Sequence, residues 1–335
     1  MTWSLREIAE KYEGAVCGDA GMRVHPTNTE STDPSGLAYA ERASALGRMA
    51  GVGALLLPRA LTGVDTPHVH VDDPRAVFHQ LLGELDRQAP MHQGIHPTAV
   101  TDLDCSIDPT AYVGAYTVVE RGAVVGPRAR IYPFVYVGEN CHIGADSVLH
   151  PHAVLCRDVR LGERCTVHSG AVIGSEGFGF TPTPNGWRRV PQIGGVHAGD
   201  DVEIRALASV ERATCTTTVL GDGVKVGDLT CVGHNARLGD HTLLVPLSGI
   251  GGSAALGQRC VLGGGSGVFD HVTLADDVRI GAYGTVTRDI DTPGDHTGTP
   301  ARPLAQQLRL DALLPKLPDL LERVRQLEER LDTGQ

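Results

Sequence analysis

From residue 95 onward the chain repeats a hydrophobic position every six residues. Hexads such as IYPFVY (131–136), VGENCH (137–142) and IGADSV (143–148) open with an aliphatic residue and usually carry a small residue or Val at the fifth position. The pattern runs to residue 291 with one break at 179–195 and gives thirty hexads, of which those starting at Thr101, Ala208 and Thr214 lack the aliphatic first residue. Since three hexads form one triangular coil, the pattern predicts about ten stacked coils of a parallel β-helix.

Each position of the hexad has an expected place in the coil. The first and fifth residues point inward, and a Gly or Asp near the second position turns the corner. Cys105, Cys141, Cys165 and Cys260 all fall at the fifth position, where a free Cys acts as a small core residue. The chain has 8 Cys and no CxxC pair, so we expect neither a disulfide framework nor a zinc site.

The segments on either side of the repeat have other patterns. Ser4 opens an amphipathic stretch typical of a capped helix, residues 53–57 and 69–71 resemble short strands, and 74–85 resembles a helix. We therefore predict a small α/β domain over 1–92, of the kind that binds nucleotides, followed by the β-helix over 93–292. The fold class is mainly β.

Helices are expected over 293–335, the first of them at 303–314. Leu317, Leu320, Val324, Leu327 and Leu331 then step by three and four residues, which is a coiled-coil spacing. This second helix either packs on its own coil or joins a three-chain bundle. We favour the bundle, because solenoid ends need capping.

Composition narrows the class of partner. The formal net charge of −11 argues against nucleic acid, whose phosphates require clustered Lys and Arg. The first ten residues lack the apolar core of a signal peptide, and no later stretch reaches the roughly 18 apolar residues of a membrane span. These features predict a cytoplasmic protein.

Several local motifs resemble one family, the UDP-3-O-acyl-glucosamine N-acyltransferases of lipid A synthesis. They are IGSEGFGF (173–180), RVPQIGGVHAGDDVEI (189–204), CVGHN (231–235), SGIGGSAALG (248–257), GGGSGVFDHVTL (263–274) and PARPLAQQLRL (300–310). The order of N-terminal domain, hexapeptide β-helix and helical tail also matches that family. The resemblance implies a left-handed coil, although the usual crossover rule would predict the opposite hand. It also implies a homotrimer with active sites between chains.

The resemblance implies transfer of a 3-hydroxyacyl chain from the phosphopantetheine thioester of acyl carrier protein to the 2-amine of a UDP-sugar, with no further cofactor and no metal. His234 is the expected general base, and an imidazole suits proton transfer at neutral pH. Gly252, 18 residues later, should lie one coil away, about 4.8 Å, where its N–H can hold an oxyanion. On repeat position alone, His234 is interpreted as a surface histidine, and Gly252 is either a turn glycine or the oxyanion donor.

Further residues are assigned to substrate binding by the same resemblance. They are His271, which lies two coils and one residue after His234, Asn235 of the HN pair, Phe178 and Phe180, and Tyr39 in place of a Phe that stacks on uracil. Phe178 precedes and Phe180 lies within the segment 179–195 that interrupts the repeat, which we call the excursion. Trp187, Arg188 and Arg189 are candidates for contact with the acidic carrier protein or a pyrophosphate. We treat His197 as a loop residue, and a simply packed loop is the alternative for the whole excursion.

The chain departs from the family's pattern at three places. Gly227 stands where the family has an Asp seven residues before the catalytic histidine, so either Asp228 supports His234 or no Asp does. The family's IDRG reads VERA, with Glu211 and Arg212. In the uracil pocket Arg42 replaces an Asn and Ala45 a Tyr. Two alternatives follow: an N-acyltransferase acting on another nucleotide amino sugar, and a trimeric scaffold without catalytic activity.

Overall fold

The computed structural model describes residues 2–85 and 93–332, with side chains at the C-terminus up to Glu329. The chain divides into two compact units, Met1–Met91 and His92–Gln335, which are described separately. Among the described residues no helix is both long and apolar enough to cross a membrane.

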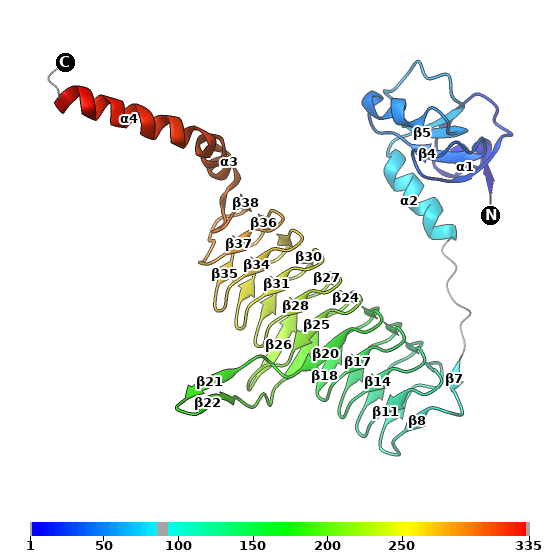
Figure 1. Cartoon of the computed structure of the whole chain (residues 1–335). Helices are drawn as coiled ribbons and strands as arrows, with labels where there is room; N and C mark the ends of the chain where they lie inside the picture. Colours follow the sequence, from blue (N-terminus) through cyan, green and yellow to red (C-terminus); the bar gives the residue numbers. More distant parts are fainter. Residues whose placement is uncertain (1, 86–92, 333–335) are drawn as a thin grey trace. The chain divides into compact units, whose positions relative to one another are not determined.

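The N-terminal unit, drawn in blue and cyan in Figure 1, contains one sheet. The sheet has six strands in the order β1-β3-β4-β5-β6-β2. The central strands pair in parallel, whereas the edge strands β1 and β2 pair antiparallel with β3 and β6. The elements are β1 (Trp3–Ser4), α1 (Leu5–Lys11), β2 (Ala15–Cys17), β3 (Arg23–Pro26), β4 (Gly36–Tyr39), the 3-10 helix η1 (Ala43–Met49), β5 (Ala54–Pro58), β6 (His68–Val71) and α2 (Pro74–Leu85).

Both faces of this sheet are covered, which follows from the alternation of side chains along β5. Leu56 packs in the cluster that includes α1 and α2, and its neighbour Leu55 packs in a second cluster with Met49 of η1. Helix α1 begins where Ser4 accepts from the Glu7 N–H and the Glu7 carboxylate accepts from the Ser4 N–H, a complete capping box. The predicted helices and strands of this segment are confirmed.

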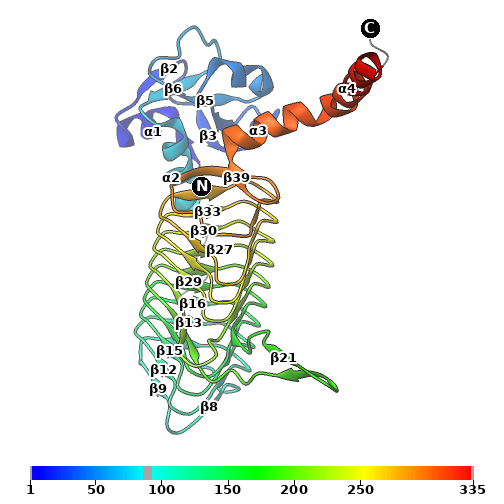
Figure 2. The same ribbon diagram turned by 90° about the vertical axis from the view of Figure 1, so that its left-hand side faces the viewer.

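The second unit is a parallel β-helix whose coils stack into three sheets (Figures 1 and 2). The first sheet contains β7 (Gly94–Ile95), β10 (Tyr112–Val113), β13 (Arg130–Ile131), β16 (Val148–Leu149), β19 (Thr166–Val167), β24 (Glu203–Ile204), β27 (Lys225–Val226), β30 (Leu243–Leu244), β33 (Val261–Leu262), β36 (Val278–Ile280), β38 (Gly294–Thr297) and β39 (Arg302–Pro303). The second contains β8 (Val100–Thr101), β11 (Val118–Val119), β14 (Tyr136–Val137), β17 (Val154–Leu155), β20 (Val172–Ser175), β25 (Ser209–Glu211), β28 (Cys231–Val232), β31 (Gly249–Ile250), β34 (Gly267–Val268) and β37 (Thr285–Val286). The third contains β9 (Ser106–Ile107), β12 (Val124–Val125), β15 (His142–Ile143), β18 (Val159–Leu161), β23 (Gly195–Ala198), β26 (Thr217–Leu220), β29 (Arg237–Leu238), β32 (Ala255–Leu256) and β35 (Thr273–Leu274).

Outside residues 196–219 the first and fifth residues of the hexads fill the interior, as predicted. Between 196 and 219 the predicted register is wrong by two residues, because Ala198, Ile204 and Val210 pair with the first residues of the preceding coil. Ile143 and Leu149 are first residues and Cys141 and Cys165 are fifth residues, and all four are buried. Burial raises the pKa of the Cys141 and Cys165 thiols to about 11, so both stay protonated and unreactive at neutral pH. Their role as core residues is therefore confirmed.

The corner of each coil is formed differently from the prediction. The residue with left-handed backbone is the fourth of the hexad, for example Asn140 (φ 57°) and Asp146 (φ 59°), and not the second. The Gly at the second position has another cause, close stacking. A Cβ on Gly144 would overlap the backbone of Gly162 in the next coil. The second position thus controls the fit between coils, and the fourth controls the turn.

The excursion leaves the coil after Ser175 and returns at Gly195. Its outer part is a two-stranded hairpin, β21 (Phe180–Thr183) and β22 (Gly186–Arg189), which extends away from the coils in Figure 1. An ion pair of 2.6 Å between Arg189 and Glu176 joins the hairpin to the start of the excursion.

The C-terminal region does not become helical at residue 293 as expected. Strands β38 and β39 first extend the first sheet, and β39 runs antiparallel to β38. Helix α3 (Leu304–Leu313), the 3-10 helix η2 (Leu314–Lys316) and α4 (Leu317–Asp332) follow. The coiled-coil positions Leu317, Leu320, Val324 and Leu327 are 42–57% exposed, and the side chain of Leu331 lies outside the described residues.

Candidate functional site

Four residues form a column at the edge of the second sheet. Strands β25, β28, β31 and β34 pair in register through Val210, Val232, Ile250 and Val268. The residues two positions after these partners therefore stack in successive coils, and they are Arg212, His234, Gly252 and Asp270.

Within this column His234 lies directly against Gly252. A Cβ on Gly252 would come within 2.7 Å of His234 Cε1 and 2.8 Å of His234 Nε2, so only glycine leaves room for the ring. The Gly252 N–H donates to Oδ1 of Asp270 at 2.9 Å. The spacing predicted from the repeat thus holds, and Gly252 already has an acceptor for its N–H within the chain.

The half-buried His234 is oriented by Asn235. The Asn235 Oδ1 accepts the backbone N–H of Thr214 at 2.8 Å, which fixes the orientation of the amide. Its Nδ2 then donates to His234 Nδ1 at 3.0 Å, so the neutral ring carries its hydrogen on Nε2, beside Gly252. The backbone N–H of His234 donates to Oε2 of Glu211 at 3.0 Å.

Asp228 does not support His234. Its Oδ1 accepts the backbone N–H of Ala206 at 3.0 Å and lies 3.6 Å from Arg205 Nε. In this chain Asn235 and Glu211 hydrogen-bond to the histidine instead. Glu211, the Glu of the VERA segment, was not predicted from the sequence to have this role.

The excursion lies against His234 at Gly177, where a Cβ would be 2.7 Å from His234 Cβ. The next aromatic residues, Phe178 and Phe180, form an edge-to-face pair with ring centroids 5.0 Å apart. With Trp187 and Asp270 they line a cavity of about 520 Å³. Phe178 is 81% exposed and Trp187 74%, which is unusual for such large apolar groups. Aromatic surface therefore lies beside the Asp270 end of the column.

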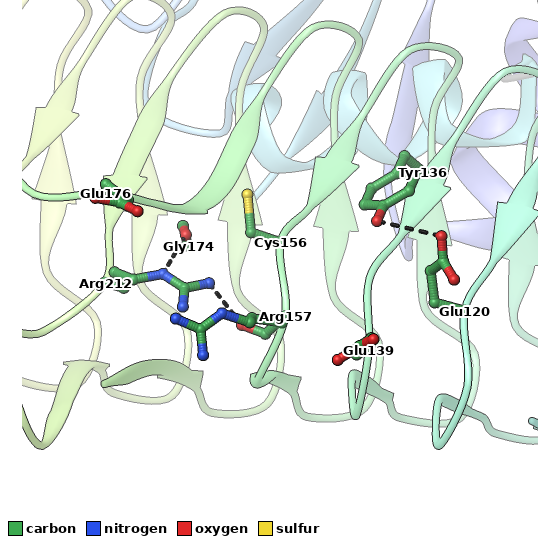
Figure 3. Close-up of a pocket in the computed structure, with 8 residues that line it drawn as sticks. All are labelled: Glu120, Tyr136, Glu139, Cys156, Arg157, Gly174, Glu176 and Arg212. Carbon is green, nitrogen blue, oxygen red and sulfur yellow. Dashed lines mark hydrogen bonds between the residues drawn. The ribbon is translucent and has the colours of Figure 1, made fainter. Parts of the chain in front are cut away.

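A second cavity, of about 510 Å³, opens beside the Arg212 end of the column (Figure 3). Arg212 is only 2% exposed; its Nε donates to the Gly174 carbonyl at 2.8 Å and its Nη2 to the Arg157 carbonyl at 2.9 Å. Its Nη1 is buried and has no hydrogen-bond partner among the described residues. The lining residues are Glu120, Tyr136, Glu139, Cys156, Arg157, Gly174, Glu176 and Arg212.

Sequence reasoning missed this cavity, although a signal was present. Glu139 and Arg157 are 18 residues apart, one coil, and so are Cys156 and Gly174. Repeat arithmetic places each pair side by side. An unpaired guanidinium N–H in a buried position suits an anionic or carbonyl oxygen of a ligand.

The two other histidines considered lie in different places. His271 is exposed, and its backbone N–H donates to the Gly252 carbonyl at 2.9 Å, so it lies at the same edge as the column. Among the described residues, no hydrogen bond or ring contact joins its side chain to His234. His197 is not a loop residue as expected: it belongs to β23 of the third sheet, paired with Arg160 and Val219.

Tyr39 lines a separate pocket in the N-terminal unit, of about 330 Å³. The other lining residues are Thr27, Asn28, Thr29, Glu30, Ala38 and Phe78. The Tyr39 ring packs against Phe78 with centroids 5.2 Å apart. Arg42 is exposed and Ala45 packs against the cluster containing Met49, and neither lines the pocket. The polar segment 27–30 was not foreseen from the sequence.

Comparison with known proteins agrees with this architecture. The family described as bacterial transferase hexapeptide (six repeats) matches residues 116–151 and 140–175. A solved structure of an Arabidopsis UDP-N-acetylglucosamine acyltransferase superposes with a TM-score of 0.57 at 21% identity, covering 65% of this chain and 77% of that one. The UDP-N-acetylglucosamine O-acyltransferase from Moraxella catarrhalis RH4 superposes with a TM-score of 0.50 at 23% identity, covering 62% and 72%. The fold is thus the left-handed β-helix of hexapeptide repeats.

Full-length relatives establish the family. The UDP-3-O-acylglucosamine N-acyltransferase of Coxiella burnetii (strain Dugway 5J108-111) is 33% identical over 98% of both chains. That of Pseudomonas paraeruginosa (strain DSM 24068 / PA7) is 35% identical over 99% of this chain and 95% of its own. The chain is an acyltransferase and belongs to the UDP-3-O-acylglucosamine N-acyltransferase family.

Proposed function

We propose that this protein transfers a 3-hydroxyacyl group from the thioester of acyl carrier protein to the 2-amine of UDP-3-O-acyl-glucosamine, a step of lipid A synthesis. The observation that carries the proposal is the contact between the His234 ring and Gly252. This contact brings an imidazole that can transfer a proton next to a backbone N–H that can stabilise an oxyanion. The chain also matches UDP-3-O-acylglucosamine N-acyltransferases along nearly its full length.

The reaction has two bond changes. The sugar nitrogen attacks the thioester carbon, and His234 takes the proton that the nitrogen loses. The carbonyl oxygen becomes an oxyanion, which the Gly252 N–H stabilises. The C–S bond then breaks, and the phosphopantetheine sulfur leaves as a thiol with the proton returned by His234. The products are an amide and the free carrier thiol.

Proton uptake at Nε2 requires a ring with its hydrogen on Nδ1. In the described contacts Nδ1 instead accepts from Asn235. The proposal therefore includes a turn of the Asn235 amide and a change of tautomer, in which the ring loses its Nε2 hydrogen to water and takes up one at Nδ1. Oδ1 of Asn235 then accepts the Nδ1 hydrogen, and the Thr214 N–H loses its acceptor. We propose that this rearrangement accompanies substrate binding.

The remaining parts of the substrates have matching surfaces. Tyr39 in its pocket is proposed to stack on the uracil, with the polar segment 27–30 available for hydrogen bonds. Phe178 and Phe180 are proposed to contact the acyl chain, and His271 and Asn235 to position the acceptor. The active site is proposed to be completed by neighbouring chains of a homotrimer, with acyl carrier protein as the donor partner.

The test is acyl transfer by the purified full-length chain. Acyl carrier protein charged with a 3-hydroxyacyl group is the donor, and the acceptor is UDP-3-O-acyl-glucosamine. We expect an N-acylated product by mass spectrometry. A parallel reaction with another nucleotide amino sugar, or with acyl-CoA as donor, tests the alternative substrates, which Arg42 and Ala45 outside the pocket lining motivate. Faster transfer to the other sugar would contradict the proposed acceptor, and no transfer with any pair would favour the non-catalytic scaffold.

A further inference from the structure

A cluster of potential metal ligands lies on the N-terminal sheet, apart from the pocket of Tyr39. Strands β2 and β6, both labelled in Figure 2, pair antiparallel. Cys17 lies opposite His68 and Ala15 opposite His70. Because side chains alternate along a strand, Cys17, His68 and His70 share one face of the sheet. Val69 lies on the opposite face, in the cluster packed by α1 and α2. The cluster therefore forms where an edge strand meets its neighbour.

Both imidazole rings have a fixed tautomer. Nδ1 of His68 lies 2.8 Å from the Thr66 carbonyl oxygen, and Nδ1 of His70 lies 3.1 Å from the Pro58 carbonyl oxygen. A carbonyl oxygen only accepts, so both Nδ1 atoms carry hydrogen. In neutral rings both Nε2 atoms then present lone pairs.

These two Nε2 atoms face each other at 3.2 Å. Two lone pairs at this distance repel unless a positive charge, either a proton or a metal ion, lies between them. A tetrahedral ion with metal–nitrogen bonds of 2.0–2.1 Å holds its two nitrogen ligands about 3.3–3.4 Å apart, which matches the distance found. The donor atoms of Cys17, His68 and His70 all lie within 4.8 Å of one another.

The surroundings also favour a metal over a proton. Ligand histidines characteristically donate their second ring N–H to a backbone carbonyl, and both rings do so here. His68 is 5% exposed, whereas Cys17 is exposed, so the group is held on one side and open to entry on the other. A thiolate and two imidazoles are the ligand types that select zinc-like ions over magnesium or calcium.

We propose that the N-terminal domain binds one Zn²⁺-type ion through Cys17 Sγ, His68 Nε2 and His70 Nε2, with water as the fourth ligand. The ion would tie the edge strand β2 to β6 and stabilise this domain. The sequence contains no CxxC pair and therefore predicts no zinc site, since these three ligands are brought together only by strand pairing. The proposal is independent of the acyl-transfer reaction.

The test uses the full-length chain, freed of any affinity tag and stripped of metal with a chelator. Zn²⁺ is titrated by calorimetry, and Co²⁺ is added as a spectroscopic probe. We expect one ion per chain, a rise in the melting temperature, and a sulfur-to-cobalt charge-transfer band. Cys17→Ser removes that band, and both Cys17→Ser and His70→Asn weaken Zn²⁺ binding by at least about tenfold.

Cys215→Ser and His197→Asn are the matched controls, since both residues are exposed and lie outside the cluster. They should bind Zn²⁺ like the unaltered chain. Binding that is equally weak in all five proteins, or a Co²⁺ spectrum without the sulfur band, would overturn the proposal. A domain whose melting temperature responds to pH and not to Zn²⁺ would show that a proton lies between the two nitrogens, which also overturns it.

Discussion

The backbone N–H of Gly252 donates to Oδ1 of Asp270, one coil further along the β-helix, at 2.9 Å. The same contact recurs at other corners, as between the Gln258 N–H and Asp276. At Gly252 it has a special consequence, because this N–H is the proposed oxyanion donor. The donor becomes available only when the Asp270 carboxylate turns away, and the carboxylate itself repels a developing negative charge.

Asp270→Ala frees the Gly252 N–H permanently. We expect kcat to stay the same or to rise, within about the 3 kcal/mol that one oxyanion donor is worth. Steady-state kinetics measure this, with Asp276→Ala as a control that removes the equivalent contact away from the column. A fall in kcat beyond about tenfold would mean that the Asp270 carboxylate itself takes part in the reaction.

Asn235→Asp tests the tautomer of His234. An Asp of the same shape keeps an acceptor for the Thr214 N–H and offers a second oxygen to a hydrogen on His234 Nδ1. The new carboxylate also stabilises the protonated ring, so the acid limb of the pH profile of kcat/KM should move to higher pH while activity above neutral pH is kept. An acid limb that stays in place would refute the assigned contact between the two side chains.

Gly144→Ala tests the stacking role of the second hexad position. The added Cβ would overlap the Gly162 backbone, so we expect a loss of about 1–3 kcal/mol in the free energy of unfolding. Gly267→Ala is the matched control, because a Cβ there meets nothing within 4 Å. Denaturant unfolding measures both. Equal stabilities of the two variants would show that the coils separate without cost.

The coiled-coil positions Leu317, Leu320, Val324 and Leu327 form an exposed apolar stripe on α4, and this stripe predicts a trimer. Changing Leu320, Val324 and Leu327 to Gln removes the coiled-coil positions, and the triple variant should sediment as a smaller species than the unaltered protein. Leu321→Gln serves as the control, because Leu321 is 68% exposed but lies off the stripe. An unaltered chain that sediments as a monomer at micromolar concentration would contradict the trimer.

The six-residue spacing of the sequence predicted the β-helix because the same positions of the hexad are buried in successive coils. Ile143 and Cys141 are buried for the same reason in every coil, so an aliphatic first residue and a small fifth residue are visible in the sequence. The turn was misplaced, since Asn140 and Asp146 adopt the left-handed conformation without being glycine. These fourth residues lie at the surface, Asn140 exposed and Asp146 half-buried, so their side chains have little packing constraint to reveal their role.

The length of one coil, 18 residues, also explains which site residues could be predicted from the sequence. His234 and Gly252 are one uninterrupted coil apart, and their contact follows from the spacing. Arg212 stands 22 residues before His234 because β25 and β28 are joined by a longer segment, so its place in the column was not visible. The Cys17 cluster depends on an antiparallel edge pairing that no local pattern specifies.

In the proposed reaction, His234 transfers the proton during acylation. The direct measurement is kcat/KM for transfer from the charged carrier protein to UDP-3-O-acyl-glucosamine with His234→Ala, after its melting temperature shows an intact fold. We expect a fall of about 10²–10⁴-fold, the usual contribution of general base catalysis, whereas His197→Ala on another sheet should leave the rate unchanged. A His234→Ala protein that acylates at the unaltered rate would contradict it.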